Sequence, residues 1–180
     1  MYSTLRAFLN GKYESGDTQT KSYQDKGFLQ RAFTPYAQNL IYEGAVDNSA
    51  VTTNPKNEPG KWGNGANANI CGTTYDKVFA LSVQEATNAD FGFHPYHDWT
   101  KYGLRLKHTT DYAKAKHVFE SRDSNNTGTD NTFASIYWLR SPSRGTGETG
   151  LTRIVDTEAI IKDRGVTTDN SGVVPAILLK

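Results

Sequence analysis

The sequence has few of the residues that several classes of protein require. Its 180 residues include one cysteine, Cys71, so an intramolecular disulfide is impossible and a disulfide-stabilised scaffold is excluded. No apolar run reaches the roughly 20 residues of a membrane helix, and Met1–Thr4 lacks the pattern of a signal peptide. With 20 basic and 19 acidic side chains the net charge is +1, so no bulk field attracts nucleic acid. We therefore expect neither nucleic-acid binding nor membrane insertion.

Aromatic residues and glycines, by contrast, are plentiful. Ten Tyr, eight Phe, three Trp and sixteen Gly are interleaved with Asn, Thr and Asp, a mixture that favours a loop-rich domain presenting aromatic rings. The length fits one compact domain over residues 1–180, and a helix start close to Met1 favours a domain excised from a longer protein. No segment of the sequence addresses the chain to a compartment, so the localisation stays open, with a cell-surface, secreted or virion-associated protein as the favoured expectation.

Patterns in the first third of the chain predict three short amphipathic helices. The first is capped by Ser3 and ends at Gly11. The second is expected over Lys26–Phe33, and the third begins at Pro35 with Thr34 as its N-cap. Residues 43–74 are rich in Asn, Gly, Thr and Pro, which predicts a long loop. Trp62 in this loop is either a buried pin or an exposed contact.

The rest of the chain predicts a helical turn, one further helix and a set of strands. Ser82–Glu85 matches a capping box after a short strand at Val78–Leu81, and Thr110 opens another helix. Ser121–Asn131 is expected to be a polar turn stretch. Further strands are expected at Phe133–Leu139, Leu151–Val155, Ala159–Lys162 and Val173–Leu179, with a hairpin turn at Asp156–Thr157. Helices first and strands last indicate an α+β fold with a largely antiparallel sheet.

Six segments together resemble the DUF6273 type, bacterial and viral domains described as of unknown function. In chain order these segments are Ser3–Asn10, Gly27–Thr34, Asp76–Ser82 with Glu85–Ala86, Thr110–Ala113, Trp138–Pro142 and Gly172–Ala176. The chain departs from the family at Val174, where the family usually carries Arg.

The resemblance implies a C-type-lectin-like fold, in which short helices pack on a small, twisted, mainly antiparallel sheet with long irregular loops. That group of folds includes formylglycine-generating enzymes and the variable proteins of diversity-generating retroelements. By the same resemblance, Trp138–Pro142 would be scaffold and the neighbouring loops would carry recognition.

One cluster of side chains could hold a metal ion. His94, His97 and Asp98 place two imidazoles and a carboxylate within five positions, and a divalent transition metal uses such ligands. Pro95 breaks helical geometry between them, so an aromatic loop with exposed or packed histidines is the competing interpretation.

Other chemical patterns are incomplete. Gly145–Gly150 has the letters of a dinucleotide-binding turn, but the strand pattern after it lacks the helix that holds phosphate. Ser141 lacks the glycine-flanked context of a hydrolase nucleophile. Asn57–Pro59 resembles a calcium-binding loop of lectins, but it lies in the early loop, outside the strand region where such a loop is expected. A formylglycine-type oxidase would need a cysteine pair, and Cys71 is alone.

The leading hypothesis is a non-catalytic recognition domain that binds a protein or a carbohydrate through surface loops, without a cofactor. The expected ligand-binding residues are Tyr96, His97, Trp99, Arg144 and Glu148, because aromatic and arginine side chains dominate interface energies. One version of this hypothesis is a retroelement variable protein. The alternatives are a metal-dependent oxidase or hydrolase centred on His94, His97 and Asp98, and a structural module of a surface or virion protein.

Overall fold

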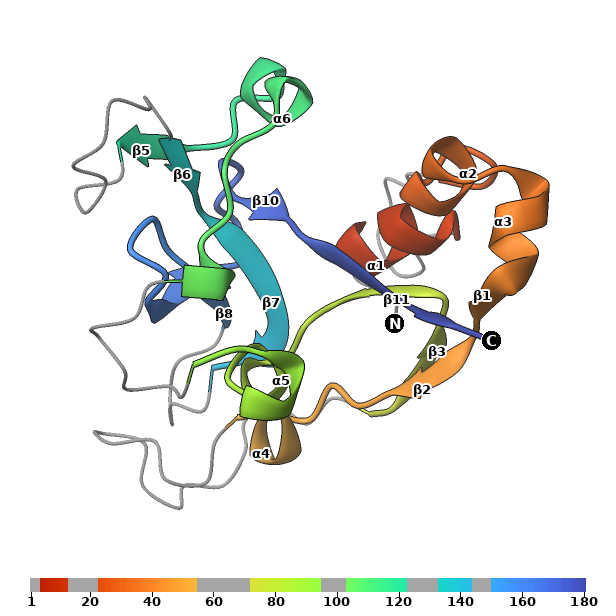
Figure 1. The fold of residues 1–180 in the computed structure, drawn as a ribbon, viewed down its shortest axis with the longest axis horizontal. Helices are drawn as coiled ribbons and strands as arrows, with labels where there is room; N and C mark the ends of the chain where they lie inside the picture. The colour runs from red at the N-terminus through yellow and green to blue at the C-terminus, as the bar shows by residue number, and fades with distance from the viewer. Residues whose placement is uncertain (1–3, 13–22, 55–71, 95–102, 123–132, 144–149) are drawn as a thin grey trace. The chain divides into compact units, whose positions relative to one another are not determined.

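The computed structural model describes residues 4–12, 23–54, 72–94, 103–122, 133–143 and 150–180. They form short helices and short, mostly antiparallel strands (Figure 1), so the predicted α+β class is confirmed. Two compact units are distinguished by their internal contacts. Unit 1 is drawn from residues 1–46, 73–80 and 175–180, and unit 2 from residues 47–72 and 81–174.

Three helices begin unit 1, as the sequence predicted, although their bounds differ slightly. They are α1 (Thr4–Asn10), α2 (Phe28–Ala32) and α3 (Pro35–Leu40). The Thr34 side chain accepts a hydrogen bond from the Ala37 amide at 3.2 Å, which confirms the predicted N-cap. Gly11 follows α1 with φ +63°, a left-handed conformation that glycine adopts without steric cost.

The strands of unit 1 form two small sheets. In the first, β11 (Pro175–Leu179) lies between β1 (Ile41–Tyr42) and β4 (Val78–Ala80), antiparallel to both. The second pairs β2 (Gly44–Val46) with β3 (Thr74–Asp76). The strand expected from Val78 is therefore present.

The Asn10 side chain covers the outer edge of β4. Its amide donates to the Val78 carbonyl at 2.8 Å, and its oxygen accepts from the Lys77 and Val78 amides at 3.0 Å each. A single buried side chain thus takes the place of a neighbouring strand and attaches α1 to the sheet.

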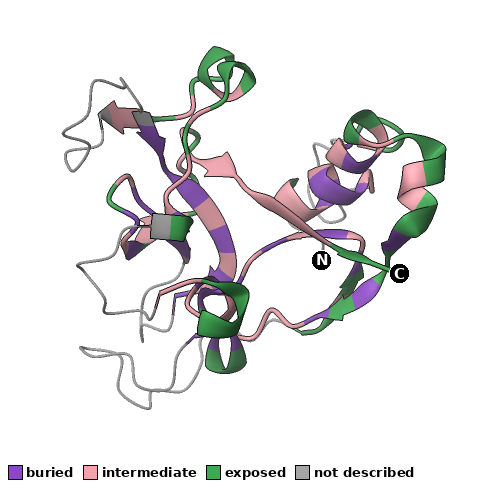
Figure 2. Ribbon diagram, in the orientation of Figure 1, coloured by how far each residue is buried: buried purple, intermediate pink, exposed green. Residues whose placement is uncertain are grey.

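A four-stranded sheet is the centre of unit 2. Its order is β10 (Gly172–Val173), β7 (Tyr137–Pro142), β8 (Leu151–Val155) and β9 (Ile161–Gly165), and only the β10–β7 pair is parallel. Burial alternates along β7 (Figure 2) because successive side chains of a strand face opposite sides. The core cluster of this unit comprises Val83, Ala86, Tyr137, Leu139, Val155, Ala159 and Ile161.

Short helices and a two-stranded sheet complete unit 2. The helices are α4 (Ala50–Thr53), α5 (Val83–Ala86), η1 (Ala89–Phe91), η2 (Gly103–Arg105) and α6 (Asp111–Ala115). The small sheet pairs β5 (Glu120–Arg122) with β6 (Phe133–Ser135). The capping box at Ser82–Glu85 and the helix after Thr110 are both confirmed.

Four expectations about secondary structure were wrong in part. The single strand expected over Phe133–Leu139 is divided between β6 and β7, which belong to different sheets. Residues 43–74 are not all loop, because they include β2, α4 and the first residue of β3. The turn stretch expected from Ser121 begins inside β5. The single strand expected over Val173–Leu179 is divided between β10 and β11, which belong to different sheets. No described helix has the length and apolarity to cross a membrane.

Candidate functional site

The described residues include only part of the predicted site. His94 lies within them, whereas Tyr96, His97, Asp98, Trp99, Arg144 and Glu148 lie outside them. Trp62, Cys71 and Asn57–Pro59 also lie outside. Within the described ranges, no group of three or more His, Cys, Asp or Glu side chains could hold a metal ion. The hypothesis of a metal bound by His94, His97 and Asp98 therefore stays a prediction.

The residues flanking segment 95–102 are joined by a buried arginine. Arg105 is 4% exposed, and its Nη1 donates to the His94 carbonyl at 2.6 Å. Its Nε donates to the carbonyl of Ala159 at 3.0 Å. A buried guanidinium is costly without partners, and backbone carbonyls satisfy it here.

The turn that Arg105 contacts joins β8 to β9, where the sequence predicted a hairpin. The Asp156 amide donates to the Ile160 carbonyl at 2.9 Å, and Asp156 Oδ1 accepts from the Glu158 and Ile160 amides at 2.9 Å each. Ala159 has φ +59° although it carries a side chain, and it is buried in the core cluster. The hydrogen bonds around the turn hold this residue in a conformation that alanine disfavours.

Arg140, within the Trp-Leu-Arg-Ser-Pro segment of β7, binds partners inside unit 2. Its Nη2 donates to Glu85 Oε1 at 2.7 Å, its Nη1 contacts Oε2, and its Nε donates to the Asp47 carbonyl at 2.9 Å. Burial alone would raise the pKa of Glu85, but hydrogen bonds from Arg140 and Ser82 outweigh it and lower that pKa below its ordinary value. Arg140 thus fixes α5 against β7.

Ser141 is fully buried and also binds within the unit. Its hydroxyl donates to the Thr53 carbonyl at 3.0 Å and accepts from the Val83 amide at 2.9 Å. Both partners are backbone groups at the ends of short helices, α4 and α5. The geometry is that of a residue that joins secondary-structure elements, in keeping with the scaffold role that the resemblance implied.

Asn54 joins the starts of two segments that lie outside the described residues. It precedes segment 55–71, and its amide donates at 3.0 Å to the carbonyl of Pro142, which lies two residues before segment 144–149. Asn54 Oδ1 accepts from Arg153 Nε at 3.3 Å, and Arg153 pairs with Asp163 at 2.9 Å. The sequence predicts only that Asn54 lies in the loop of residues 43–74, and no local pattern marks this contact.

The two predicted recognition segments are anchored at opposite ends of the β8–β9 hairpin. Segment 144–149 ends next to Gly150, whose carbonyl accepts from the Val166 amide at 2.8 Å at the open end of the hairpin. Segment 95–102 follows His94, which Arg105 links to the turn at the other end. The five residues of β8 lie between Gly150 and Asp156, which are therefore about 20 Å apart at the usual rise per residue.

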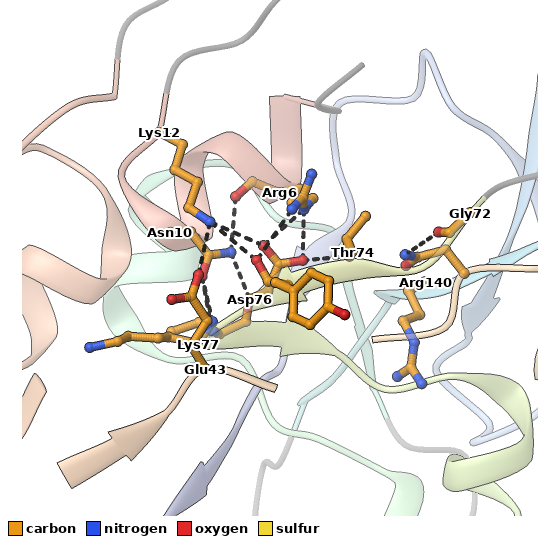
Figure 3. A network of polar contacts seen from close by, with 12 residues as sticks. Arg6, Asn10, Lys12, Glu43, Gly72, Thr74, Asp76, Lys77 and Arg140 are labelled. Carbon is orange, nitrogen blue, oxygen red and sulfur yellow. Dashed lines mark hydrogen bonds and ion pairs between the residues drawn. The ribbon is translucent and has the colours of Figure 1, made fainter. Parts of the chain in front are cut away.

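Unit 1 has a polar network of its own, centred on Asp76 (Figure 3). Arg6 Nε donates to both carboxylate oxygens of Asp76, at 2.8 and 2.6 Å, and the Thr74 hydroxyl donates at 2.6 Å. Lys12 Nζ lies 3.8 Å from Asp76 and 3.4 Å from Glu43. Because Asp76 is 2% exposed and bound from several sides, this network serves to join α1 to β3.

Comparison with known proteins identifies the family. A family model described as a domain of unknown function (DUF6273) matches residues 1–180. The chain belongs to the DUF6273 family. No curated protein and no solved structure shows significant similarity to it.

In this DUF6273 domain, Val174 packs against the core cluster of unit 2. At this position the sequence departs from the family resemblance, because Val stands where Arg was expected. An apolar side chain suits a site beside this cluster, whereas a guanidinium there would need partners.

Proposed function

We propose that this DUF6273 domain is a non-catalytic recognition domain of C-type-lectin-like architecture. It binds a protein or a carbohydrate through two segments, with Tyr96, His97 and Trp99 in one and Arg144 and Glu148 in the other. In one version of the proposal it is a variable protein of a diversity-generating retroelement, displayed on a cell or virion surface or secreted.

The observation that carries the proposal is that polar side chains of the Trp-Leu-Arg-Ser-Pro segment bind partners within unit 2. Arg140 and Ser141 are occupied by Glu85 and by backbone groups of α4 and α5. Side chains with buried partners stabilise a scaffold and are not presented to a ligand. A rigid scaffold under variable connecting segments is the arrangement that binding domains commonly use.

The α+β architecture also supports the finer fold assignment. Short helices accompany small, mainly antiparallel sheets, and the described ranges leave long connections between β7 and β8 and after α4. The C-type-lectin-like group shares these features, so we place the domain there as part of the proposal.

Because the two segments are anchored about 20 Å apart along β8, we treat them as two contact areas. A large partner spans that distance easily, since a standard protein interface buries about 800 Å² on each side. A single sugar residue contacts one area only. Variants of the two segments are therefore tested separately.

The test is a binding panel with a glycan array and a displayed library of short peptides as probes. We expect at least one class of probe to bind the wild type, and Tyr96→Ala with Trp99→Ala, or Arg144→Ala with Glu148→Ala, to abolish that binding. Val166→Ala is the matched control, because Val166 is an exposed residue of unit 2 outside both segments.

Two outcomes would replace the proposal. Stoichiometric metal in the purified protein that is lost on His97→Ala would favour a metal-dependent oxidase or hydrolase. Silence of both probe classes, with the domain embedded in a multidomain polypeptide, would favour a structural module of a surface or virion protein.

A further inference from the structure

The last residue of α1 and the glycine after it, Asn10 and Gly11, form a chemically reactive pair. In an Asn-Gly pair the glycine nitrogen can attack the carbonyl carbon of the asparagine side chain, because glycine has no side chain to obstruct the approach. The nitrogen loses its proton as it bonds to that carbon, ammonia leaves, and a cyclic succinimide results. Water then opens the ring to aspartate or isoaspartate, so the net change replaces an amide with a carboxylate.

In the folded chain the Asn10 carboxamide is held away from this reaction (Figure 3). Its nitrogen donates to the Val78 carbonyl at 2.8 Å and to the Arg6 carbonyl at 3.2 Å. Its oxygen accepts from the Lys77 and Val78 amides at 3.0 Å each. Turning the carbonyl carbon towards Gly11 would break these hydrogen bonds, and because Asn10 is 4% exposed, little water reaches the reacting atoms.

Two further residues of unit 1 cover Gly11. A Cβ atom placed on Gly27 would lie 2.5 Å from the Gly11 nitrogen and would also clash with the Phe8 carbonyl oxygen, so the two glycines meet backbone to backbone. The Gln30 carboxamide fills the space that a side chain of Gly11 would need, and its nitrogen donates to the Asn10 carbonyl at 3.5 Å. The reactive nitrogen and carbon are therefore enclosed while α1 and α2 stay together.

We propose that Asn10–Gly11 is a deamidation site gated by the opening of unit 1. The closed unit blocks the reaction, and each opening exposes the pair to water. The product lacks the N–H groups that donate to Val78, and its isoaspartate form adds a carbon to the main chain. Unit 1 then closes with lower stability, so a reversible opening becomes a permanent change. The proposal does not depend on the recognition function.

Deamidation of the full chain in native buffer and in guanidinium chloride tests the gate. The protein carries Asn64→Gln, because Asn64–Gly65 is the other Asn-Gly pair of the sequence and lies outside the described residues. Peptide mass spectrometry follows the conversion of Asn10 in mildly alkaline solution. We expect it to be at least about a hundredfold slower in the native protein, since the reaction waits for a sparsely populated open state. A smaller difference would overturn the proposal.

Gly27→Ala, in the same background, tests whether unit 1 itself is the gate. The added methyl group forces Gly27 away from Gly11, and we expect deamidation in native buffer to be about tenfold faster. Gly172→Ala is the matched control, because Gly172 is a closely packed glycine of unit 2, where an added Cβ would lie 3.3 Å from Val118. It should leave the rate at Asn10 unchanged.

Equal acceleration by both substitutions, or none by Gly27→Ala, would overturn the proposal. If Gly27→Ala does not fold, the comparison of native and unfolded protein decides.

The refolded product tests the permanent change. Ion exchange separates the deamidated protein by its added negative charge, and the unreacted fraction of the same sample is the control. We expect amides of the β4–β11 ladder to exchange hydrogen at least about tenfold faster in the deamidated fraction, with less change in the β7–β8 ladder. Identical exchange in both fractions would overturn the proposal. No ligand enters these measurements, so a failed binding panel leaves their result intact.

Discussion

Buried asparagine side chains connect distant parts of the chain at the scale of single residues. The Asn10 side chain binds the Lys77 amide and both the amide and the carbonyl of Val78. The Asn54 side chain joins α4 to β7 and to Arg153. A carboxamide is both donor and acceptor and carries no charge. It therefore satisfies backbone groups of both kinds without the desolvation cost of a carboxylate.

Asn10→Asp should destabilise the protein by about 2 to 4 kcal/mol. The substitution keeps the shape of the side chain but replaces the donor that binds the Val78 carbonyl with an acceptor. Urea denaturation at pH 7 measures the change in the free energy of unfolding. Asn48→Asp is the control, because the Asn48 amide donates to the Gly72 carbonyl in an exposed position. Equal losses in the two variants would contradict the role assigned to Asn10.

His117→Gly should stabilise the protein by about 0.5 to 1 kcal/mol. His117 follows α6 with φ +60°, and the amides of His117 and Val118 donate to the Lys114 and Ala113 carbonyls, the Schellman pattern in which glycine is favoured. Thermal and urea unfolding both measure the gain. Ala115→Gly, inside the same helix, should instead cost about 1 kcal/mol. A loss of stability in His117→Gly would show that its side chain makes a compensating contact.

At the scale of elements, local signals predicted caps and turns but not pairing. Thr34, Ser82 and Thr110 were recognised as N-caps because a cap depends on residues three positions away. The parallel β10–β7 pair and the place of β11 between β1 and β4 depend on residues far apart in sequence. No periodicity in the sequence encodes those partners.

The candidate site shows the same division between local and distant information. The hairpin turn after Asp156 was predicted from two residues. The bonds from Arg105 to His94 and Ala159, and from Asn54 to Pro142, span 11, 54 and 88 positions. Arg105 had no distinguishing neighbours in the sequence, so its burial and its two carbonyl partners appear only in the folded chain.

Glu85→Gln should remove part of the acid sensitivity of the protein. The pKa of Glu85 is lowered in the fold, so its contribution to stability is present above the unfolded-state pKa and is lost as the pH falls through the folded-state value. Glutamine keeps the capping box with Ser82 but removes the charge that pairs with Arg140. The cost at pH 7 should be about 1 to 3 kcal/mol and should shrink towards pH 3.

Urea midpoints from pH 3 to pH 7 measure this difference. Glu43→Gln is the control, since Glu43 is half exposed and lies 3.4 Å from Lys12, so its substitution should change stability by less than about 1 kcal/mol. A pH-independent cost for Glu85→Gln would show that the ion pair with Arg140 does not contribute.

At the scale of the whole molecule, each unit is assembled from distant parts of the chain. Unit 1 takes its central strand, β11, from the end of the sequence and its helices from the beginning. Unit 2 has its own core cluster around Tyr137 and Leu139. The concentration of contacts within each unit allows each to open by itself, since cooperative opening follows the contacts that a segment shares.

Hydrogen exchange in dilute urea should therefore distinguish the two units. Asn10→Asp weakens α1 and β4, so amides of the β4–β11 ladder in unit 1 should exchange at least about tenfold faster, while those of the β7–β8 ladder should change less. Ser141→Ala removes the hydroxyl that joins α4 to α5 in unit 2 and should produce the reverse pattern. If either substitution accelerated exchange equally in both ladders, the two units would open as one and would not be independent in stability.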